Sequence, residues 1–282
     1  MKDGIVILDK EKGVTSRKCD NAFQRLFHTK KVGHLGTLDP FATGLLIVAI
    51  GKGCKFLPFL PDEEKTYLAS LRLGASSSTG DPEGEIEEGF KVPELTDKEV
   101  VAALSSFLGE SEQLPPMQSA IKIDGKPLYK LAHEGKEIER KKRKIHVSSI
   151  RLLSFKDNVI DFSVTVSKGT YIRVLGEDIA KKLGTKGYLL SLRRVANGRI
   201  GLQYAKKLEE ITEDDVLDPT PFLFGYPHVE LREDEAIKAR NGVRLDLEKD
   251  FGEFACLTRN GSAIAIYQKE TGTIYHSYRG LF

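Results

Sequence analysis

The alternation of apolar and polar residues predicts the first elements of this chain. Gly4–Asp9 and Leu45–Ile50 are short apolar runs, which favour two buried strands. Between them, apolar residues at helical spacing follow Ser16, which we expect to be the N-cap of a helix. Residues 29–43 lack clear periodicity and contain glycines and a proline, which indicates a loop.

The same analysis predicts a mixture of strands and helices further along the chain. Residues 66–73 alternate with the period of a strand. Thr96–Glu99 forms a capping-box pattern, which opens a helix that is expected to end at Gly109. The other elements expected before residue 200 are strands at 148–154, 159–166 and 188–195 and a helix at 173–183.

Two prolines in Asp218–Pro221 suggest a linker. Beyond it lie a helical pattern at 233–240 and short β-rich runs, so we expect one domain over 1–220 and a small β-rich domain over 221–282. A length of 282 residues agrees with about two domains.

Composition places the chain among globular proteins, because 40% of its residues are hydrophobic and 30% are charged. The apolar run Leu45–Ile50 is far shorter than the roughly 20 residues that cross a bilayer. The N-terminus shows no secretory apolar region, so we expect the cytoplasm and no membrane. The three cysteines and six histidines are scattered, which predicts neither a disulfide framework nor a metal site.

Positive charge is concentrated in three segments, although the net charge is only +2. Lys and Arg exceed Asp and Glu by five in 1–56, by five in 121–144 and by six in 168–199. If these segments share one face, they suit a phosphate backbone. Ordinary solvated surface is the alternative for each segment.

The most informative run is Gly33–Gly44, with the sequence GHLGTLDPFATG. The proline after Asp39 keeps that carboxylate in extended or turn backbone, and the small neighbours allow close approach of a ligand. From composition and spacing alone this is a loop with an exposed carboxylate.

The whole run resembles the catalytic motif of the TruB family of tRNA pseudouridine synthases. Four further blocks follow in the family's order, over about residues 4–200. They are ILDK with GVTS at 7–16, KTY to RLG at 65–74, QLPPMQSA with LYKLA at 113–132, and SKGTYIR at 167–173. One position departs from the pattern: Glu11 stands where the family often has proline.

The resemblance implies a pseudouridine synthase fold of the α+β class. Its features would be a mixed, mainly antiparallel central sheet, a thumb-like RNA-clamping insertion at about 116–146 and a PUA-type C-terminal domain. The implied reaction is isomerisation of uridine 55 in the tRNA T-loop: the N1–C1′ bond breaks, the base rotates and C1′ joins C5. No cofactor is implied, and the sequence has no phosphate-binding GxxxxGK[ST] loop.

Three residues carry the chemistry in this comparison. Asp39 is similar to the essential aspartate, which attacks C1′, attacks C6 or removes the C2′ proton; these three routes stay open. Arg173 resembles the arginine that pairs with that aspartate, where it would lower the aspartate pKa. Tyr67 resembles the tyrosine that stacks on the uracil, with a core tyrosine as the alternative.

The remaining pocket residues are assigned on the same basis. The target nucleotide must leave its stack, and His34 is the candidate that holds the flipped state; a loop histidine bonded to backbone is the alternative. Tyr171 is expected to pack beside Arg173. Three more positions complete the expected substrate-binding set: Leu192 lining the uracil site, Lys10 as a weaker pocket candidate, and Asp81 in RNA contact or a local turn.

The partner implied is the T-stem–loop of tRNA. Lys141, Lys142, Arg143 and Lys144 in the insertion would meet phosphates, and T-loop shape would supply specificity. The C-terminal domain is either RNA-binding or a stabilising appendage. The chain lacks basic low-complexity termini, which favours a stand-alone enzyme over one that acts in a guide-RNA complex. We expect a monomer that requires no protein partner. A non-catalytic RNA-binding module is the other rival, and the intact Asp39, Tyr67 and Arg173 set speaks against it.

Overall fold

The computed structural model describes residues 2–62, 64–119, 121–123, 125–128, 131 and 138–281, without the side chains of 122, 123 and 127. Contacts divide the chain into two units. The first unit contains residues 1–40, 44–62 and 199–282, and the second contains 41–43 and 63–198.

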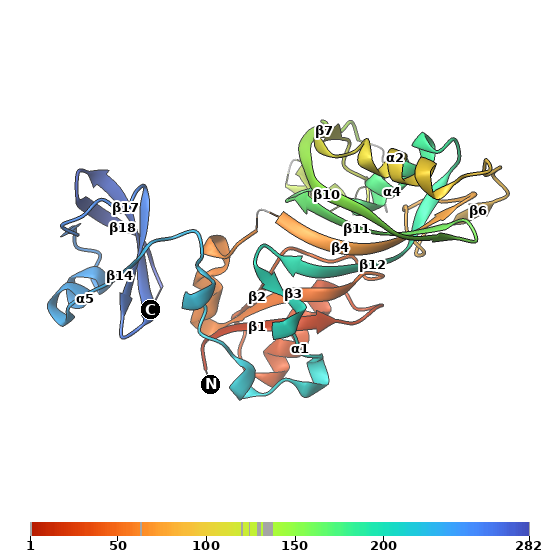
Figure 1. Cartoon of the computed structure of the whole chain (residues 1–282). Coiled ribbons are helices and arrows are strands. Elements are labelled where there is room, and N and C mark those ends of the chain that lie inside the picture. The colour runs from red at the N-terminus through yellow and green to blue at the C-terminus, as the bar shows by residue number, and fades with distance from the viewer. Residues whose placement is uncertain are drawn as a thin grey trace. The chain divides into compact units, whose positions relative to one another are not determined.

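The first unit begins with a small antiparallel group of strands, against which α1 lies (Figure 1). Its elements are β1 (Gly4–Lys10), α1 (Ser16–Leu26), β2 (Val32–Leu35) and β3 (Thr43–Ile50). The central strand β3 pairs with β1 from Ile50↔Gly4 to Gly44↔Lys10, and with β2 along its second half. Both predicted apolar runs are therefore strands. In each of β1 and β3, all residues but one are buried.

Two local predictions for this region were wrong. Thr15, not Ser16, is the N-cap of α1: its Oγ1 accepts the Lys18 amide at 3.1 Å. The expected loop of 29–43 contains the strand β2, which is only half-buried and carries glycine and histidine. Its pairing with β3 stabilises it, and sequence periodicity does not report that tertiary contact.

The rest of the first unit holds a five-stranded sheet in the order β14-β16-β17-β18-β15. The strands of this sheet are β14 (His228–Glu230), β15 (Leu245–Asp246), β16 (Phe254–Arg259), β17 (Ser262–Thr271) and β18 (Ile274–Gly280). The first unit also contains the short strand β13 (Ile200–Gly201), which is not part of this sheet, and the helix α5 (Glu233–Arg240). The predicted helix and β-rich runs are confirmed. The segment expected to be a linker forms a short 3-10 helix, Thr220–Phe222, and Asp218 accepts hydrogen bonds from the Thr220 amide and the Ser262 hydroxyl, both at 2.8 Å.

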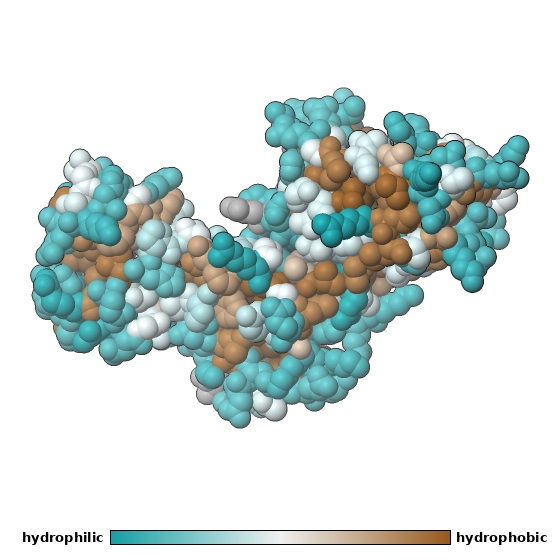
Figure 2. Space-filling model, viewed as in Figure 1, coloured by the Kyte–Doolittle hydropathy of each residue, from teal (hydrophilic) through white to brown (hydrophobic). Residues whose placement is uncertain are grey.

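Two apolar clusters stabilise the first unit. One joins β1 and β3 to Phe222, Cys256 and Leu281. The other lies under α5, where the buried Tyr267 donates its hydroxyl to the Val243 carbonyl at 2.8 Å. In Figure 2, hydrophilic residues cover most of the periphery of the chain, and hydrophobic residues show over the strands.

The second unit is an antiparallel sheet with the helices α2 (Asp97–Ser105) and α4 (Ile172–Lys182) on one side (Figure 1). Adjacent strands pair in the order β12-β4-β11-β10-β7. Its elements are β4 (Glu64–Leu73), β5 (Ala75–Ser77), β6 (Ile86–Glu88), α2 (Asp97–Ser105), β7 (Gly109–Gln113), β8 (Lys122–Ile123), β9 (Lys126–Pro127), β10 (Arg143–Lys156), β11 (Val159–Ser167), α4 (Ile172–Lys182) and β12 (Gly187–Asn197). The capping box at Thr96 and Glu99 is present as predicted.

Helix α4 covers the buried face of β4 and β12. Residues 65, 67, 69, 71 and 73 of β4 are buried, as the alternating sequence predicts. A Cβ at Gly176 of α4 would lie 2.9 Å from Leu189 Cδ2 and 3.4 Å from Leu71 Cδ1, so glycine lets the helix approach closely. This face also carries the candidate pocket residues.

The predicted insertion at about 116–146 is only partly described. The short strands β8 and β9 form a hairpin, in agreement with the hairpin-like pattern. Residues 120, 124, 129, 130 and 132–137 lie outside the described residues, and this set includes part of the block at 128–132.

Candidate active site

The first part of the site is the loop that carries Asp39, which is half-buried at the start of the turn after Leu38. Ser16, buried in α1, binds the Leu38 backbone in both directions: its hydroxyl accepts the Leu38 amide at 2.9 Å and donates to the Leu38 carbonyl at 3.1 Å. The Pro40 carbonyl accepts the Gly13 amide at 2.7 Å. The backbone is thus fixed on both sides of Asp39.

Lys10 supports the same loop from the end of β1. Its side chain is 1% exposed, and its ammonium donates to the carbonyls of Val14 at 2.7 Å, Glu11 at 2.9 Å and Pro40 at 3.3 Å. A buried ammonium requires such partners, because burial of an unpaired charge is very costly. Glu11, at the position where the family often has proline, supplies one of these carbonyls. These hydrogen bonds make Lys10 a support of the loop. Contact of Lys10 with substrate stays a prediction.

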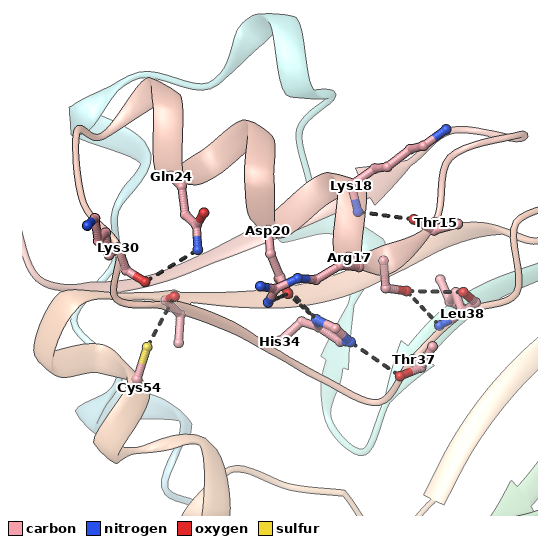
Figure 3. A network of polar contacts seen from close by, with 12 residues as sticks. Thr15, Arg17, Lys18, Asp20, Gln24, Lys30, His34, Thr37, Leu38 and Cys54 are labelled. Atoms are coloured by element: carbon pink, nitrogen blue, oxygen red, sulfur yellow. Dashed lines mark hydrogen bonds and ion pairs between the residues drawn. The ribbon is translucent and has the colours of Figure 1, made fainter. Parts of the chain in front are cut away.

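His34 lies beside this loop in β2 (Figure 3). Its Nδ1 is 3.0 Å from both carboxylate oxygens of Asp20 in α1, and its Nε2 is 3.2 Å from the Thr37 hydroxyl. The alternative weighed from the sequence is a loop histidine bonded to backbone. These contacts differ from it, because both ring nitrogens face side chains.

Tyr67 and Leu192 lie in neighbouring strands of the second unit. Tyr67 in β4 is opposite Arg194 in β12, and Leu192 is opposite Ala69, so the two side chains share the face that α4 covers. They are 7% and 6% exposed. An aromatic ring beside an apolar side chain can accept a flat pyrimidine.

Arg173, in the first turn of α4, pairs with Asp81 in the loop after β5. Their Nη1 and Oδ2 atoms are 3.3 Å apart, and both side chains are 4% exposed. Arg173 also donates to the carbonyl of Thr79 at 2.8 Å and to that of Gln118 at 2.9 Å. Asp81 accepts the Thr79 hydroxyl at 2.6 Å and the Glu83 amide at 3.0 Å. Of the two roles considered for Asp81, RNA contact and a local turn, these contacts show the local turn. Asp81 also forms an ion pair that the sequence did not predict.

The packing around this ion pair is tight. Gly80 has φ +74°, and a Cβ there would lie 2.8 Å from Glu177 Oε1 and 3.2 Å from Arg173 Cβ. Burial raises the pKa of the Glu177 carboxyl, and the charge of Asp178 adds to this, while Arg173 opposes it. The loop thus needs glycine at position 80 to bring Asp81 to Arg173.

Tyr171, the N-cap of α4, is oriented through its backbone. Gln113, the last residue of β7, accepts the Tyr171 amide at 2.8 Å and donates to the Tyr171 carbonyl at 3.1 Å. Tyr171 makes no side-chain cap of the helix, and the Gln113 amide binds the backbone of this N-cap residue. The start of the helix, and with it Arg173, is fixed to the edge of the sheet.

The four basic residues of the predicted phosphate contact are exposed. Lys141 and Lys142 precede β10, whereas Arg143 and Lys144 are its first residues, opposite Gln113 and Glu112 of β7. They form one short basic run, and phosphate binding by it stays a prediction.

Sequence reasoning missed Asp20 and Gln113 and misassigned Ser16. Asp20 did carry a signal: it occupies the buried face of α1 with Ser16 and Phe23, where a lone carboxylate requires a partner. Gln113 gave no comparable signal, because its partner is a backbone 58 positions away.

The described residues contain neither a cluster of metal-binding side chains nor a membrane-spanning helix. Within the described ranges, no group of three or more His, Cys, Asp and Glu side chains could hold a metal ion. Among the helices that the structure describes, none is long and apolar enough to cross a membrane.

Comparisons with known proteins show the family of the chain. Residues 24–172 match the family model described as TruB family pseudouridylate synthase (N terminal domain). The chain is 39% identical to a protein named tRNA pseudouridine synthase B from Bacillus pumilus, over 95% of this chain and 94% of that protein. A protein of the same name from Chromohalobacter salexigens is 48% identical, over 70% of this chain and 64% of that protein.

Solved structures show the fold. A chain in the crystal structure of a Cbf5-Nop10-Gar1 complex matches with a TM-score of 0.75 at 20% identity, over 99% of this chain and 85% of that chain. A chain in the structure of an H/ACA RNP bound to a substrate RNA containing 2′-deoxyuridine matches with a TM-score of 0.74 at 19% identity, over 99% of this chain and 85% of that chain. The predicted fold class, a mixed α+β sheet protein with a β-rich C-terminal part, is confirmed.

Proposed function

The chain belongs to the TruB family of pseudouridylate synthases, and on that premise we propose that it converts uridine 55 in the T-loop of tRNA into pseudouridine. Membership makes it an isomerase. The tRNA substrate is supported by the names of its relatives, and the position within the T-loop by the motif GHLGTLDPFATG.

The reaction is balanced without an added reagent. The bond between uracil N1 and ribose C1′ breaks, the base rotates, C5 bonds to C1′, and the C5 proton leaves while N1 gains one. We assign Asp39 the essential carboxylate role, through attack on C1′, attack on C6 or removal of the C2′ proton. These routes remain alternatives within the proposal.

One observation carries the proposal: the backbone on either side of Asp39 is fixed. The Leu38 backbone is bound by Ser16, and the Pro40 carbonyl by Lys10 and Gly13. A reacting carboxylate must be positioned closely, because a displacement of about 1 Å can cost roughly 100-fold in rate. A simple surface turn has no need of a buried lysine and serine for its backbone.

The uracil pocket is proposed on the α4-covered face of β4 and β12. Tyr67 would stack on the uracil, for about 1–3 kcal/mol, and Leu192 would line the pocket. Arg173 and Tyr171 enter from the start of α4, where Asp81 and Gln113 orient them. In this proposal His34 holds the nucleotide in its flipped state, which costs a few kcal/mol of stacking.

The tRNA is proposed to bind through its backbone and shape. Lys141, Lys142, Arg143 and Lys144 would contact phosphates, and residues 221–282 would form a PUA-type RNA-binding domain beside a catalytic domain over 1–220. We further propose a monomer that works in the cytoplasm, where its tRNA substrate is found, without a cofactor or a protein partner.

The decisive experiment measures tritium release from unmodified tRNA labelled at C5 of uridine. The wild-type chain should release one equivalent of tritium per tRNA, and a transcript with cytidine at position 55 should release none. Asp39→Asn should abolish release while tRNA binding stays within about twofold, because one oxygen is replaced by an isosteric NH₂. Release from the cytidine-55 transcript, or turnover by Asp39→Asn, would falsify the assigned position or the assigned residue.

A further inference from the structure

Asp20 and His34 connect helix α1 to strand β2 beside the loop that carries Asp39. His34 Nδ1 lies 3.0 Å from each carboxylate oxygen of Asp20, and Figure 3 shows the ring between Asp20 and Thr37. Both distances lie within the range of N–H···O hydrogen bonds. The imidazole therefore has a defined partner on each side.

Burial identifies His34 as the main partner of Asp20. The Asp20 side chain is 3% exposed and that of His34 is 18% exposed. Arg17 also approaches Asp20, but at 3.5 Å and with a side chain that is 70% exposed, so water screens that pair. The buried carboxylate relies chiefly on the imidazole for its hydrogen bond.

This pairing selects one tautomer of His34. An ionised carboxylate only accepts hydrogen bonds, so Nδ1 carries a hydrogen. The other nitrogen, Nε2, is 3.2 Å from the hydroxyl of Thr37, which is exposed and lies two residues before Asp39. Asp20 thereby determines both the ring orientation and which nitrogen faces the Asp39 loop.

We propose that Asp20 is a positioning residue: it holds His34 in the orientation and tautomer with which the imidazole meets the flipped nucleotide. The inference rests on the proposed function, since it presumes that His34 faces RNA. A purely structural role, in which Asp20 only joins α1 to β2, is the competing explanation. The positioning role and the structural role of Asp20 predict different effects when His34 is also replaced.

The first test needs no RNA and reads the histidine ring directly. The full chain is labelled with ¹⁵N-histidine, and His34 is assigned by comparison with His34→Gln. In the wild type, and in Asp20→Asn whose amide oxygen still accepts, Nδ1 should carry a hydrogen. In Asp20→Ala the ring signals should shift as Nδ1 loses its acceptor. A wild-type Nδ1 without hydrogen overturns the proposal.

The second test measures single-turnover tritium release at saturating enzyme. Asp20→Ala should slow the wild-type rate constant by at least about tenfold, and Asp20→Asn should restore it to within about threefold. In a His34→Ala background the Asp20→Ala change should have no further effect, because neighbours that act together are not additive. An Asp20→Ala effect of the same size in both backgrounds shows a structural role and overturns the proposal.

Two controls keep the outcomes separate. Arg17→Ala removes the exposed neighbour of Asp20 and should leave turnover within about twofold of the wild type. If the wild-type chain itself releases no tritium, the proposed function fails, while the ring tautomer still decides whether Asp20 orients His34. If Asp20→Ala does not fold, the comparison of Asp20→Asn with Asp20→Leu replaces it.

Discussion

The guanidinium of Arg173 and the carboxylate of Asp81 form an ion pair of 3.3 Å in which each side chain is 4% exposed. The pair joins the loop after β5 to the first turn of α4. Arg173 reaches a third segment through the Gln118 carbonyl, so three parts of the second unit meet at one cation. Removal of Asp81 takes one carboxylate away from a buried guanidinium and takes the shared acceptor away from the Thr79 hydroxyl and the Glu83 amide.

Asp81→Ala should therefore destabilise the protein by about 3–5 kcal/mol and slow tritium release. Asp81→Asn should lose less stability, because its amide oxygen can still accept the Thr79 hydroxyl and the Glu83 amide. Urea unfolding measures both. Glu87→Ala is the matched control: its pair with Lys186 is 3.8 Å long and exposed, so it should change stability by less than about 1 kcal/mol. Equal losses for Asp81→Ala and Glu87→Ala would show that burial of the ion pair is unimportant.

Lys10→Met should destabilise the protein and slow turnover together. The variant takes the ammonium donor away from the carbonyls of Glu11 and Val14, at about 1–3 kcal/mol for each that stays buried. The Pro40 carbonyl keeps the Gly13 amide but loses its bond to Lys10, which loosens the backbone next to Asp39. Lys12→Met, at an exposed position two residues further on, is the control and should change neither quantity. Thermal unfolding and single-turnover tritium release measure the two effects. A rise in the Kd for tRNA at unchanged stability would make Lys10 a substrate contact instead.

Alanine at Lys141, Lys142, Arg143 and Lys144 should weaken tRNA binding and flatten its dependence on salt. Each lost phosphate contact removes about 0.7–0.9 from the slope of log K against log salt, so the full set removes about 3. Lys156→Ala is the control, since Lys156 is exposed at the opposite end of β10 and should leave the slope unchanged. Binding is measured by filter retention between 50 and 300 mM salt. A slope equal to that of the wild type would remove this basic run from the RNA contact.

Acid should destabilise the C-terminal sheet through Asp250. The Lys269 ammonium, 2.6 Å away, and the Gly252 amide hold the pKa of Asp250 below its ordinary value of 3.8. The folded state thus binds this proton more weakly than the unfolded chain. The stabilisation is complete above pH 3.8 and is lost as the pH falls through the lowered pKa.

Asp250→Asn should accordingly lower Tm at pH 7, and its difference from the wild type should shrink as the pH falls below 3.8. Calorimetry from pH 7 to pH 2.5 measures this. The difference should also shrink in 1 M salt, where charges are screened within about 3 Å. A Tm difference that is constant with pH would assign the effect to packing instead.

Sequence patterns predicted those elements whose signal is local. The buried strands β1 and β3 are apolar runs, β4 alternates strictly, and α2 begins with a complete capping box. Each signal depends on residues within a few positions of one another. The strand β2 lacked such a signal, because its stability comes from pairing with β3.

The candidate site also contains residues that the sequence identifies and partners that it does not. The motif around Asp39, with Tyr67 and Arg173, could be recognised from residue order alone, and so could the family. The partners of these residues could not be recognised. Ser16 was expected to cap its own helix, yet its hydroxyl binds Leu38, which is 22 positions away.

The amino-acid order by itself thus determined the class of fold and the family, and it singled out the candidate reacting residues, since these inferences depend on short-range periodicity and on motifs. Only the tertiary structure decided which groups hold those residues: Lys10 and Ser16 at the Asp39 loop, Asp20 at His34, and Asp81 at Arg173. The physical reason is that a buried polar group must find a partner in space. Which partner it finds depends on how distant segments pack, and local sequence does not contain that information.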